Sequence, residues 1–407
     1  MYKKSIPLFL LAFILVSCVN DNNTEVAIDE PEVYEFTRNG SSTVSFSGQT
    51  ARILMAEELI STMMDFDGAT ESLLLQMYRN RDASGGNADP FSNPELNSET
   101  KSIKEKVAAS EDYFSSNASE SVQIRNEFES WISGQVSEVF PNENTLASPG
   151  QAGQIADGTS VRYVNAQGLE YNQMVTKSLI GALMTDQMLN NYLSSSVLDA
   201  GTNREDNDNE VLVDGTSYTT MEHKWDEAYG YLFGAASNQA DPLTELGSAD
   251  SFLDKYLGRV ENDDDFAGIA EEIFNAFKRG RAAIVAGAYD VRDEQAEIIR
   301  QRISEIIGIR AVFYLESAKT ILEGNSPDYG AIFHDLSEAY GFIYSLQFTR
   351  VPGSDEPYFT GSEVQSFLDR MLGDGPNGLW DLTPETLDAL SDDIAAPFNF
   401  SIEEAAG

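Results

Sequence analysis

Eleven residues decide the fold: HKWDEAYGYLF at positions 223–233, which return as HDLSEAYGFIY at positions 334–344. Both stretches read His, three residues, Glu-Ala-Tyr-Gly, and then three aromatic or aliphatic residues. The chain has only two histidines, and both begin this pattern. Because chance alone rarely produces such a match, we predict an internal duplication, with one helix in each half descended from a common ancestor.

The spacing within each copy has chemical content. In a helix, positions i and i+4 share a face, so His223 lies over Glu227 and His334 over Glu338. Imidazole and carboxylate are ligands for zinc, iron or copper, and two such helices facing each other would supply four. Three simpler interpretations compete. Each histidine could hydrogen-bond its own glutamate, the Ala-Tyr-Gly segments could be packing motifs, or the two copies could face apart.

Outward from these copies, apolar residues recur at helical spacing along nearly the whole chain after residue 50. The pattern predicts an all-α fold, a duplicated bundle of antiparallel helices, with a short β-hairpin within residues 32–48. We expect one helical domain, 32–407, with halves of roughly 32–200 and 201–407. Helices are expected at 53–64, 71–78, 102–109, 119–139, 169–197, 220–235, 248–258, 266–289, 291–323, 327–347, 362–373 and 383–391. Loops are expected at 82–94 and 202–210, and a break within the fold at 141–161.

The first residues predict export and a lipid anchor. Lys3 and Lys4 precede an apolar run of about eleven residues, which is shorter than the roughly 20 that a membrane-spanning helix needs. The run ends in Leu-Val-Ser-Cys, a bacterial lipobox in which Cys18 would carry the lipid. Residues 1–18 are therefore expected to be a lipoprotein signal peptide and 19–31 a flexible polar leader. Val19 is not the aspartate that retains enteric lipoproteins in the inner membrane, so we expect an outer-membrane lipoprotein.

Composition excludes several functions. The 26 Lys and Arg residues stand against 67 Asp and Glu, a formal charge of −41, which argues against binding nucleic acid. Because Cys18 is the only cysteine, the chain has no internal disulfide and no cysteine-ligated metal. The hydrophobic content of 42% is ample for a packed core, so the chain is not a disordered one.

The remaining motifs are incomplete. Asp206, Asp208 and Glu210 resemble the start of a calcium loop, but Val211 stands where glycine is needed and the closing glutamate is missing. Arg279-Gly280-Arg281 is basic in an acidic chain, and we expect ion pairs with acidic neighbours there, with carboxylate or phosphate binding as the alternative. No HExxH, Gly-x-Ser-x-Gly or phosphate-loop motif occurs in the sequence.

Together with the lipobox, four stretches resemble the imelysin-like superfamily, and within it a Bacteroidota lipoprotein family known only as a domain of unknown function. They are Tyr34–Leu59, Tyr171–Met188, Met221–Phe233 and Pro327–Phe348. The resemblance implies two helical-bundle halves and association with iron or haem acquisition at the cell envelope. Imelysin itself was described as a peptidase.

Relatives in that superfamily carry a Gly-x-His-x-x-Glu motif proposed to bind metal. By position its histidine is His223, but Met221 replaces the glycine, and Asp226 stands where glutamate is expected, with Glu227 beside it. In the second copy Ser337 holds that offset and Glu338 follows. These departures argue against peptidase activity and leave metal binding open, because aspartate is also a metal ligand.

The leading expectation is a non-enzymatic envelope lipoprotein that binds iron, haem, zinc or another metal. The candidate ligands are His223, Asp226, Glu227, His334 and Glu338, with Cys18 as the lipidation site. One alternative is a metal-dependent peptidase in which Glu227 acts as base on a water near His223. Another is a structural partner of an outer-membrane transporter, held to the membrane by its lipid and binding through its acidic surface.

Overall fold

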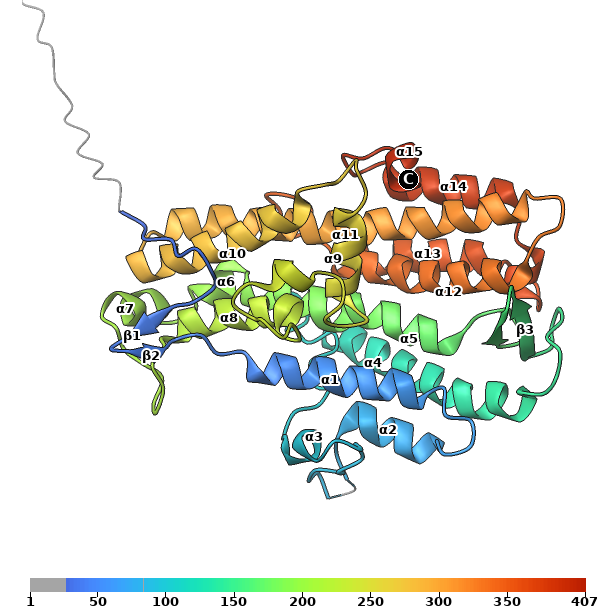
Figure 1. Ribbon diagram of the computed structural model, residues 1–407, viewed down its shortest axis with the longest axis horizontal. Coiled ribbons are helices and arrows are strands. Elements are labelled where there is room, and N and C mark those ends of the chain that lie inside the picture. The colour runs from blue at the N-terminus through green and yellow to red at the C-terminus, as the bar shows by residue number, and fades with distance from the viewer. Residues whose placement is uncertain (1–26, 83) are drawn as a thin grey trace, which may run out of the picture.

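The computed structural model describes residues 27–82 and 84–407, so Cys18 and its lipobox lie outside the described residues. Within that part the fold is all-α, as predicted, with a small hairpin near the start (Figure 1). The α-helices are α1 (Ser47–Thr62), α2 (Glu71–Arg79), α3 (Pro94–Ser98), α4 (Ala118–Gly134), α5 (Tyr171–Leu179), α6 (Ser195–Leu198), α7 (Asn203–Asp208), α8 (Thr220–Phe233), α9 (Leu253–Glu261), α10 (Ile269–Ala286), α11 (Tyr289–Leu322), α12 (Tyr329–Ser345), α13 (Gly361–Leu372), α14 (Pro384–Ala395) and α15 (Ile402–Ala405). Most of the long helices follow the long axis of the molecule, and α9 crosses them.

Two strand pairs interrupt the helices. The predicted hairpin is β1 (Thr37–Arg38) with β2 (Ser41–Ser42), joined by a turn in which Asn39 and Gly40 have positive φ. The second, β3 (Gly153–Asp157) with β4 (Ser160–Val164), forms within and just beyond the segment expected to be a break. It packs on the start of α12, where an added Cβ on Gly330 would come within 2.0 Å of the Ala156 carbonyl oxygen.

The helix predicted at 169–197 forms the centre of the bundle. It continues from α5 through two π-helical segments, η3 (Ile180–Thr185) and η4 (Met188–Tyr192). Its residues from 174 to 194 are buried on all sides, as expected for a helix enclosed by others. Gly181 marks a close helix contact, because a Cβ there would lie 2.5 Å from that of Ser345 on α12.

Two local predictions were wrong. Residues 102–109 form turns and no helix, because their backbone amides bond elsewhere. The amide of Ala108 donates to the Ala182 carbonyl and that of Ala109 to the Asp186 carboxylate, while Ala108 itself has φ +46°. Residues 202–210, expected as a loop, contain the short helix α7.

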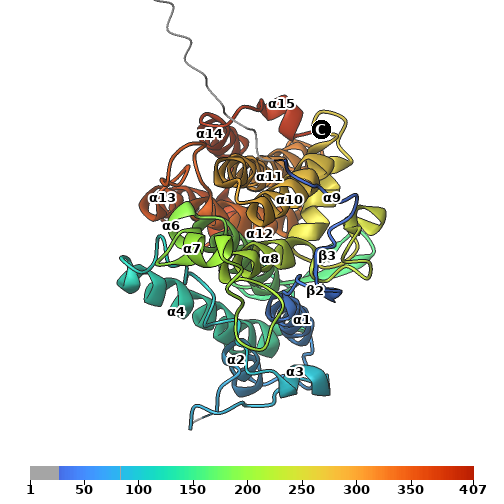
Figure 2. The ribbon, with the colours of Figure 1, turned by 90° about the vertical axis from the view of Figure 1, so that its left-hand side faces the viewer.

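The layers fix which helices can share a site. Helix α11 packs against α10 on one side and α12 on the other, and α12 packs on α5. Helix α8 packs on α1, α10 and η4. Viewed from one end, α1 to α4 lie on one side of the molecule and α14 and α15 on the other, with α8 and α12 between them (Figure 2). The two copies of the His-Glu pattern therefore lie on inner helices.

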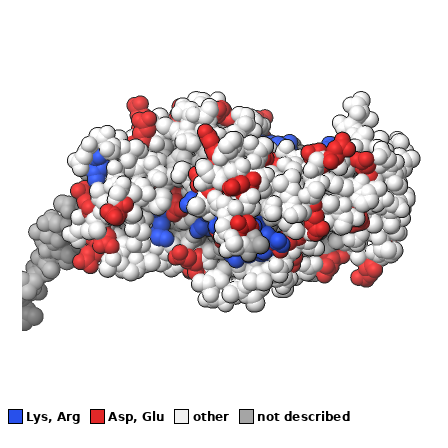
Figure 3. Space-filling view, turned by 90° about the horizontal axis from the view of Figure 1, so that it is seen from below, with Lys and Arg blue, Asp and Glu red and all other residues white. Residues whose placement is uncertain are grey.

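The surface reflects the acidic composition. Asp and Glu are spread over the face that carries α1 to α3, and Lys and Arg gather in its middle (Figure 3). Some basic residues in and after α2 are neutralised, since Arg79 and Lys104 both pair with Glu129, and Arg81 pairs with Glu105. Among residues 27–82 and 84–407, no helix has the length and apolar character needed to cross a membrane.

Candidate functional site

Each copy of the repeated pattern lies on one helix, the first on α8 and the second on α12. A side-chain cap starts both helices. Thr219 accepts from the Glu222 amide while Glu222 accepts from the Thr219 amide, and Asp328 accepts from the amides of Gly330 and Ala331. The caps set the helical phase, so each histidine lies one turn before its glutamate on the same face.

The glycine of each copy marks a close contact with a second helix. A Cβ on Gly230 would lie 2.4 Å from that of Phe46, at the start of α1. A Cβ on Gly341 would lie 2.3 Å from that of Lys177 on α5. The packing interpretation of the Ala-Tyr-Gly segment therefore describes what these glycines do. The first copy packs on α1 and the second on α5, which are equivalent contacts.

In the first copy, the histidine and glutamate bind different groups. His223 Nδ1 lies 3.0 Å from the Ser45 carbonyl oxygen, and since a carbonyl only accepts, Nδ1 carries the proton. The ring stacks on Tyr218 at 4.5 Å. One turn on, Glu227 accepts from the Gln49 amide at 2.8 Å. His223 does not hydrogen-bond its own glutamate.

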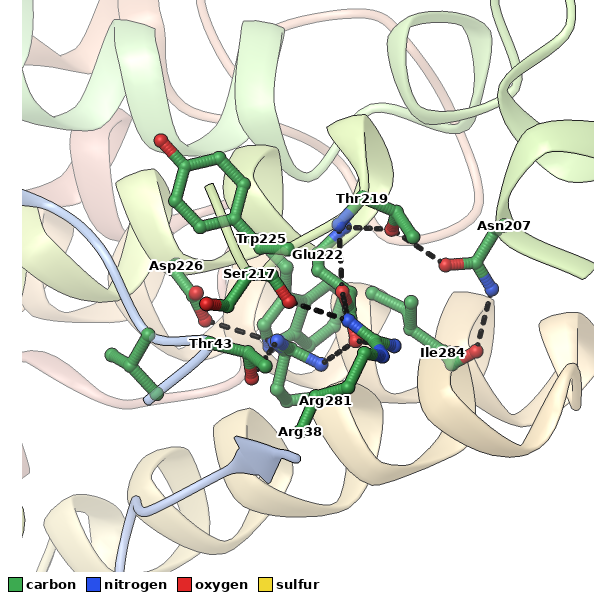
Figure 4. A network of polar contacts seen from close by, with 12 residues as sticks. Arg38, Thr43, Asn207, Ser217, Thr219, Glu222, Trp225, Asp226, Arg281 and Ile284 are labelled. Carbon is green, nitrogen blue, oxygen red and sulfur yellow. Dashed lines mark hydrogen bonds and ion pairs between the residues drawn. The ribbon is translucent and has the colours of Figure 1, made fainter. Parts of the chain in front are cut away.

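Asp226 belongs to a separate, buried network (Figure 4). Arg281 of α10, fully buried, donates through Nε to Asp226 and through Nη1 to Glu222, each at 3.0 Å. Arg38 also donates to Glu222 through both terminal nitrogens, at 2.9 and 3.1 Å. The Tyr34 hydroxyl donates to Asp226 at 2.8 Å. Two carboxylates thus face two guanidinium groups, and the charge of this network balances.

Burial is the largest influence on the pKa values of the acidic groups around the first copy. Burial raises the pKa of Asp226 to about 6, against the opposing effect of Arg281 and of the Tyr34 hydrogen bond. For Glu222 burial acts in the same direction, but the charge of Arg281 and the bonds from Arg38 leave its pKa below the usual value. Burial beside Asp226 also raises the pKa of Tyr34.

In the second copy, the histidine and the glutamate belong to one polar cluster. His334 Nδ1 donates to Glu170 at 3.0 Å, and Nε2 lies 3.6 Å from Glu338 Oε1. Lys177 Nζ lies 3.3 Å from the same Glu338 oxygen, and the Tyr256 hydroxyl donates to the other oxygen at 3.2 Å. Although burial alone would raise the pKa of Glu338, the charges of Lys177 and His334 lower it to about 2.

The structure does not bring the five predicted ligands into one site. His223, Asp226 and Glu227 contact α1, α10 and the segment before α1, whereas His334 and Glu338 contact α5 and α9. Throughout the described residues, no hydrogen bond or ion pair joins the two copies, and no group of three His, Cys, Asp or Glu side chains is arranged to hold a metal ion. The interpretation in which the copies face separate surroundings matches this geometry.

A cleft of about 690 Å³ opens beside the first copy, lined by residues between 34 and 50 together with Gln239 and Ala240. Ser45, which accepts from His223, lines it, but none of the predicted ligands of the first copy does. The cleft is therefore adjacent to the candidate site and separate from it.

Sequence reasoning missed the partners of these residues. Arg281 was expected to form ion pairs, and it does, but nothing local indicated Glu222 and Asp226 as its partners, 59 and 55 residues away. Gly280 beside it admits the Trp225 ring, which an added Cβ would meet at 2.1 Å. Glu170, just before α5, and Lys177 within it could not be identified from the sequence, because a single charged residue among buried ones forms no recognisable pattern.

Comparison with known proteins gives one match. A family described as Domain of unknown function (DUF4856) matches residues 31–401, which is nearly all of the described chain. No curated protein and no solved structure matches significantly. Since the match covers both copies of the pattern and every helix that contacts them, the chain belongs to the DUF4856 family.

Proposed function

We propose that this chain is a lipid-anchored, non-enzymatic binding protein of a bacterial cell envelope, with imelysin-like architecture, that takes part in acquiring iron, haem or another metal. The observation that carries the proposal is which ring nitrogen of each histidine donates a hydrogen bond. In both, Nδ1 donates to a carbonyl or carboxylate oxygen, which directs Nε2 away as the available nitrogen. Histidines that bind metals are held in this way.

The second copy is the better of the two binding sites. His334 Nε2 has Glu338 at 3.6 Å, and the His334 side chain is 22% exposed, so a ligand has access. In the first copy Asp226 is fully buried among Arg281, Tyr34 and the Ser45 amide, so a ligand has no access to it. We therefore place the ligand at His334 and Glu338 and assign the acids of the first copy to the stability of the bundle.

The proposal of a non-enzymatic role has its own support. A metallopeptidase needs a general base free to act on a metal-bound water. Glu227, the candidate base, is engaged by the Gln49 amide at 2.8 Å, and Glu338 by Lys177 and Tyr256. The peptidase alternative predicts cleavage of unfolded protein that chelators abolish.

The proposed anchor is supported by the lipobox and by the end of the molecule from which the chain emerges. The described residues begin at the end that carries α7 and the start of α11 (Figure 1). Ile28 lies there beside Gly287 and Ala288. Val211, Leu212 and Val213, which follow α7, and Val285 at the end of α10 are exposed apolar side chains. An apolar end next to the tether suits a protein held at an outer-membrane surface.

Metal content is the direct test of the binding proposal. The protein is purified in detergent without nickel affinity, and its metals are measured beside His334→Ala and His223→Ala. We expect metal near one per chain, lost in His334→Ala and kept in His223→Ala. Absence of metal from the wild-type protein under oxidising and reducing conditions alike would refute metal binding. Co-purification with an outer-membrane transporter, unchanged in both variants, would favour the alternative of a structural partner.

A further inference from the structure

Four cationic side chains surround the ring of Tyr256 on α9. The Nζ atoms of Lys177 and Lys255 lie 5.2 and 5.8 Å from the ring centre, and the Cζ atoms of Arg259 and Arg310 lie 5.2 and 5.6 Å from it. We call these four residues the cationic cluster. Their concentration is unusual in a chain with 26 basic and 67 acidic residues.

The cationic cluster lacks matching negative charge. Glu338 is the carboxylate in contact with it, through Lys177 and the Tyr256 hydroxyl. Glu57 lies farther out and acts on Lys255 without a direct bond. Burial, and then the charges of Lys177 and Arg259, lower the pKa of Lys255, as expected where cations crowd together. Four positive charges against one contacting carboxylate leave an excess of about three, which attracts an anion.

Arg310 is the member that most requires a partner. It is 5% exposed, and within the described part of the chain it forms no hydrogen bond and no ion pair. Its Nε and Nη2 atoms are shielded from solvent without an acceptor. The guanidinium lies 3.9 Å from the centre of Phe313 and 4.6 Å from that of Tyr314, so the rings hold it in place. Burial of an unpaired charge is costly, and a planar guanidinium fixed by aromatic rings is suited to carboxylate or phosphate.

Helix α9, which carries Lys255, Tyr256 and Arg259, crosses the long helices (Figure 1). Arg259 is exposed and donates to the Tyr314 hydroxyl at 2.6 Å, and Lys255 is half-buried. His334 contacts the same Glu338 as Lys177. The cluster therefore adjoins the ligand site of the second copy.

We propose that the cationic cluster binds a multiply charged oxyanion, a polycarboxylate or a phosphate group, with Arg310 as its principal contact. This inference rests on the proposed function, because it names the chemical class of the ligand at the second copy. Positive charge so close to His334 and Glu338 repels a free metal ion, so a metal would enter as an anionic complex. Arg310 then contacts the oxyanion and Lys177 balances Glu338.

Calorimetric titration tests the inference with citrate and with inorganic phosphate as probes, in detergent at constant ionic strength in chloride. The variants are Arg310→Met and, as a matched control, Lys104→Gln, a basic residue already paired with Glu129. We expect saturable binding of at least one probe to the wild-type protein, weakened at least tenfold in Arg310→Met and unchanged in Lys104→Gln. Should Arg310→Met fail to fold, Arg259→Met, at an exposed position, replaces it with the same expectation.

Binding of citrate alone would assign the site to carboxylates, and binding of phosphate alone would assign it to phosphate groups. Lack of binding by both probes at millimolar concentration would overturn the inference, as would equal binding in Arg310→Met and the wild type. Metal content is measured on the same samples. Metal lost in His334→Ala without any anion binding would leave the proposed function standing and refute only the oxyanion.

Discussion

The two copies of one sequence pattern pack against their neighbours in the same way, but the charges around them are balanced in the first copy and unbalanced in the second. In both, a glycine brings the helix against a neighbour. The glutamate of the first copy accepts from the Gln49 side chain of that neighbour, and the glutamate of the second copy forms an ion pair with Lys177. The first copy adds Glu222 and Asp226, which Arg38 and Arg281 neutralise.

The second copy has Phe333 and Ser337 at the positions that match Glu222 and Asp226, and it lies beside the cationic cluster. Its charges are therefore not matched within the described residues. The difference shows that two segments with one sequence pattern can share the contacts that hold helices together while their polar positions differ. A balanced, buried network contributes to stability, whereas an unbalanced one near solvent is suited to binding.

The largest expected effect is a difference in stability between variants of two buried arginines. Arg281→Met removes the partner of two buried carboxylates, and we expect the free energy of unfolding to fall by about 3–5 kcal/mol. Arg310→Met removes a charge with no partner, so we expect a change of less than about 1 kcal/mol, or a gain, in anion-free buffer. Urea unfolding of both variants gives the comparison. Equal losses would mean that Arg310 has a compensating partner and that the contrast between the copies is wrong.

The packing shared by the copies can be tested at its glycines. Gly230→Ala and Gly341→Ala each place a Cβ within 2.4 Å of a Cβ on the neighbouring helix. Overpacking of this kind costs about 1–3 kcal/mol, and we expect similar losses at both positions. Gly86→Ala, at an exposed loop position where the nearest contact is 3.4 Å, is the control and should be close to neutral. A loss at only one of the helical glycines would show that the two helix contacts are not equivalent.

The pH dependence of stability should have opposite signs in the two copies. The pKa of Asp226 is about 6 in the folded protein, above the unfolded value near 4, so the folded state binds the proton more tightly. The stability from this group is full below pH 4 and is lost as pH rises towards 6. Glu338, with a pKa of about 2, contributes stability above about pH 4.5 that is lost as pH falls.

Urea unfolding of Asp226→Asn and Glu338→Gln beside the wild type measures both effects. From pH 4 to 6.5, the stability of the wild type relative to Asp226→Asn should decrease by about 1–3 kcal/mol. From pH 5 down to 3, the wild type should lose a similar advantage over Glu338→Gln. A difference that stays constant with pH in either pair would contradict the assigned burial and partners of that carboxylate.

Features that depend on local sequence could be predicted, whereas features that depend on contacts between distant segments could not. Helical periodicity is local, so the all-α class and most long helices were predicted, and the first hairpin was found within residues 32–48. The β3–β4 hairpin was missed because its residues are largely half-exposed and its packing on Gly330 comes from α12. The contact between α12 and Lys177, and the crowding of four cations at Tyr256, join distant segments. No local pattern records such contacts, so the cationic cluster could not be predicted.

The smallest expected effect concerns the helix caps, and it tests how far each copy acts as a unit. Thr219→Ala should cost about 1–2 kcal/mol, because Thr219 caps α8 and also donates to Asn207 at 2.7 Å. Asp328→Ala should cost about 1 kcal/mol, because it only caps α12 and accepts from the Gly158 amide. Thr219→Ser and Asp328→Asn keep an oxygen at each cap and serve as controls.

The coupling of each cap to its arginine is more informative than the single losses. Glu222 both completes the cap of α8 and pairs with Arg281, so Thr219→Ala and Arg281→Met should be non-additive by at least about 0.5 kcal/mol. Asp328 shares no partner with Arg310, so the double variant of Asp328→Ala and Arg310→Met should be additive within that margin. Additivity in the first pair would mean that the network of α8 is a set of independent contacts. Coupling in the second would mean that the cationic cluster is tied into the fold and is less open to a ligand than its unpaired arginine indicates.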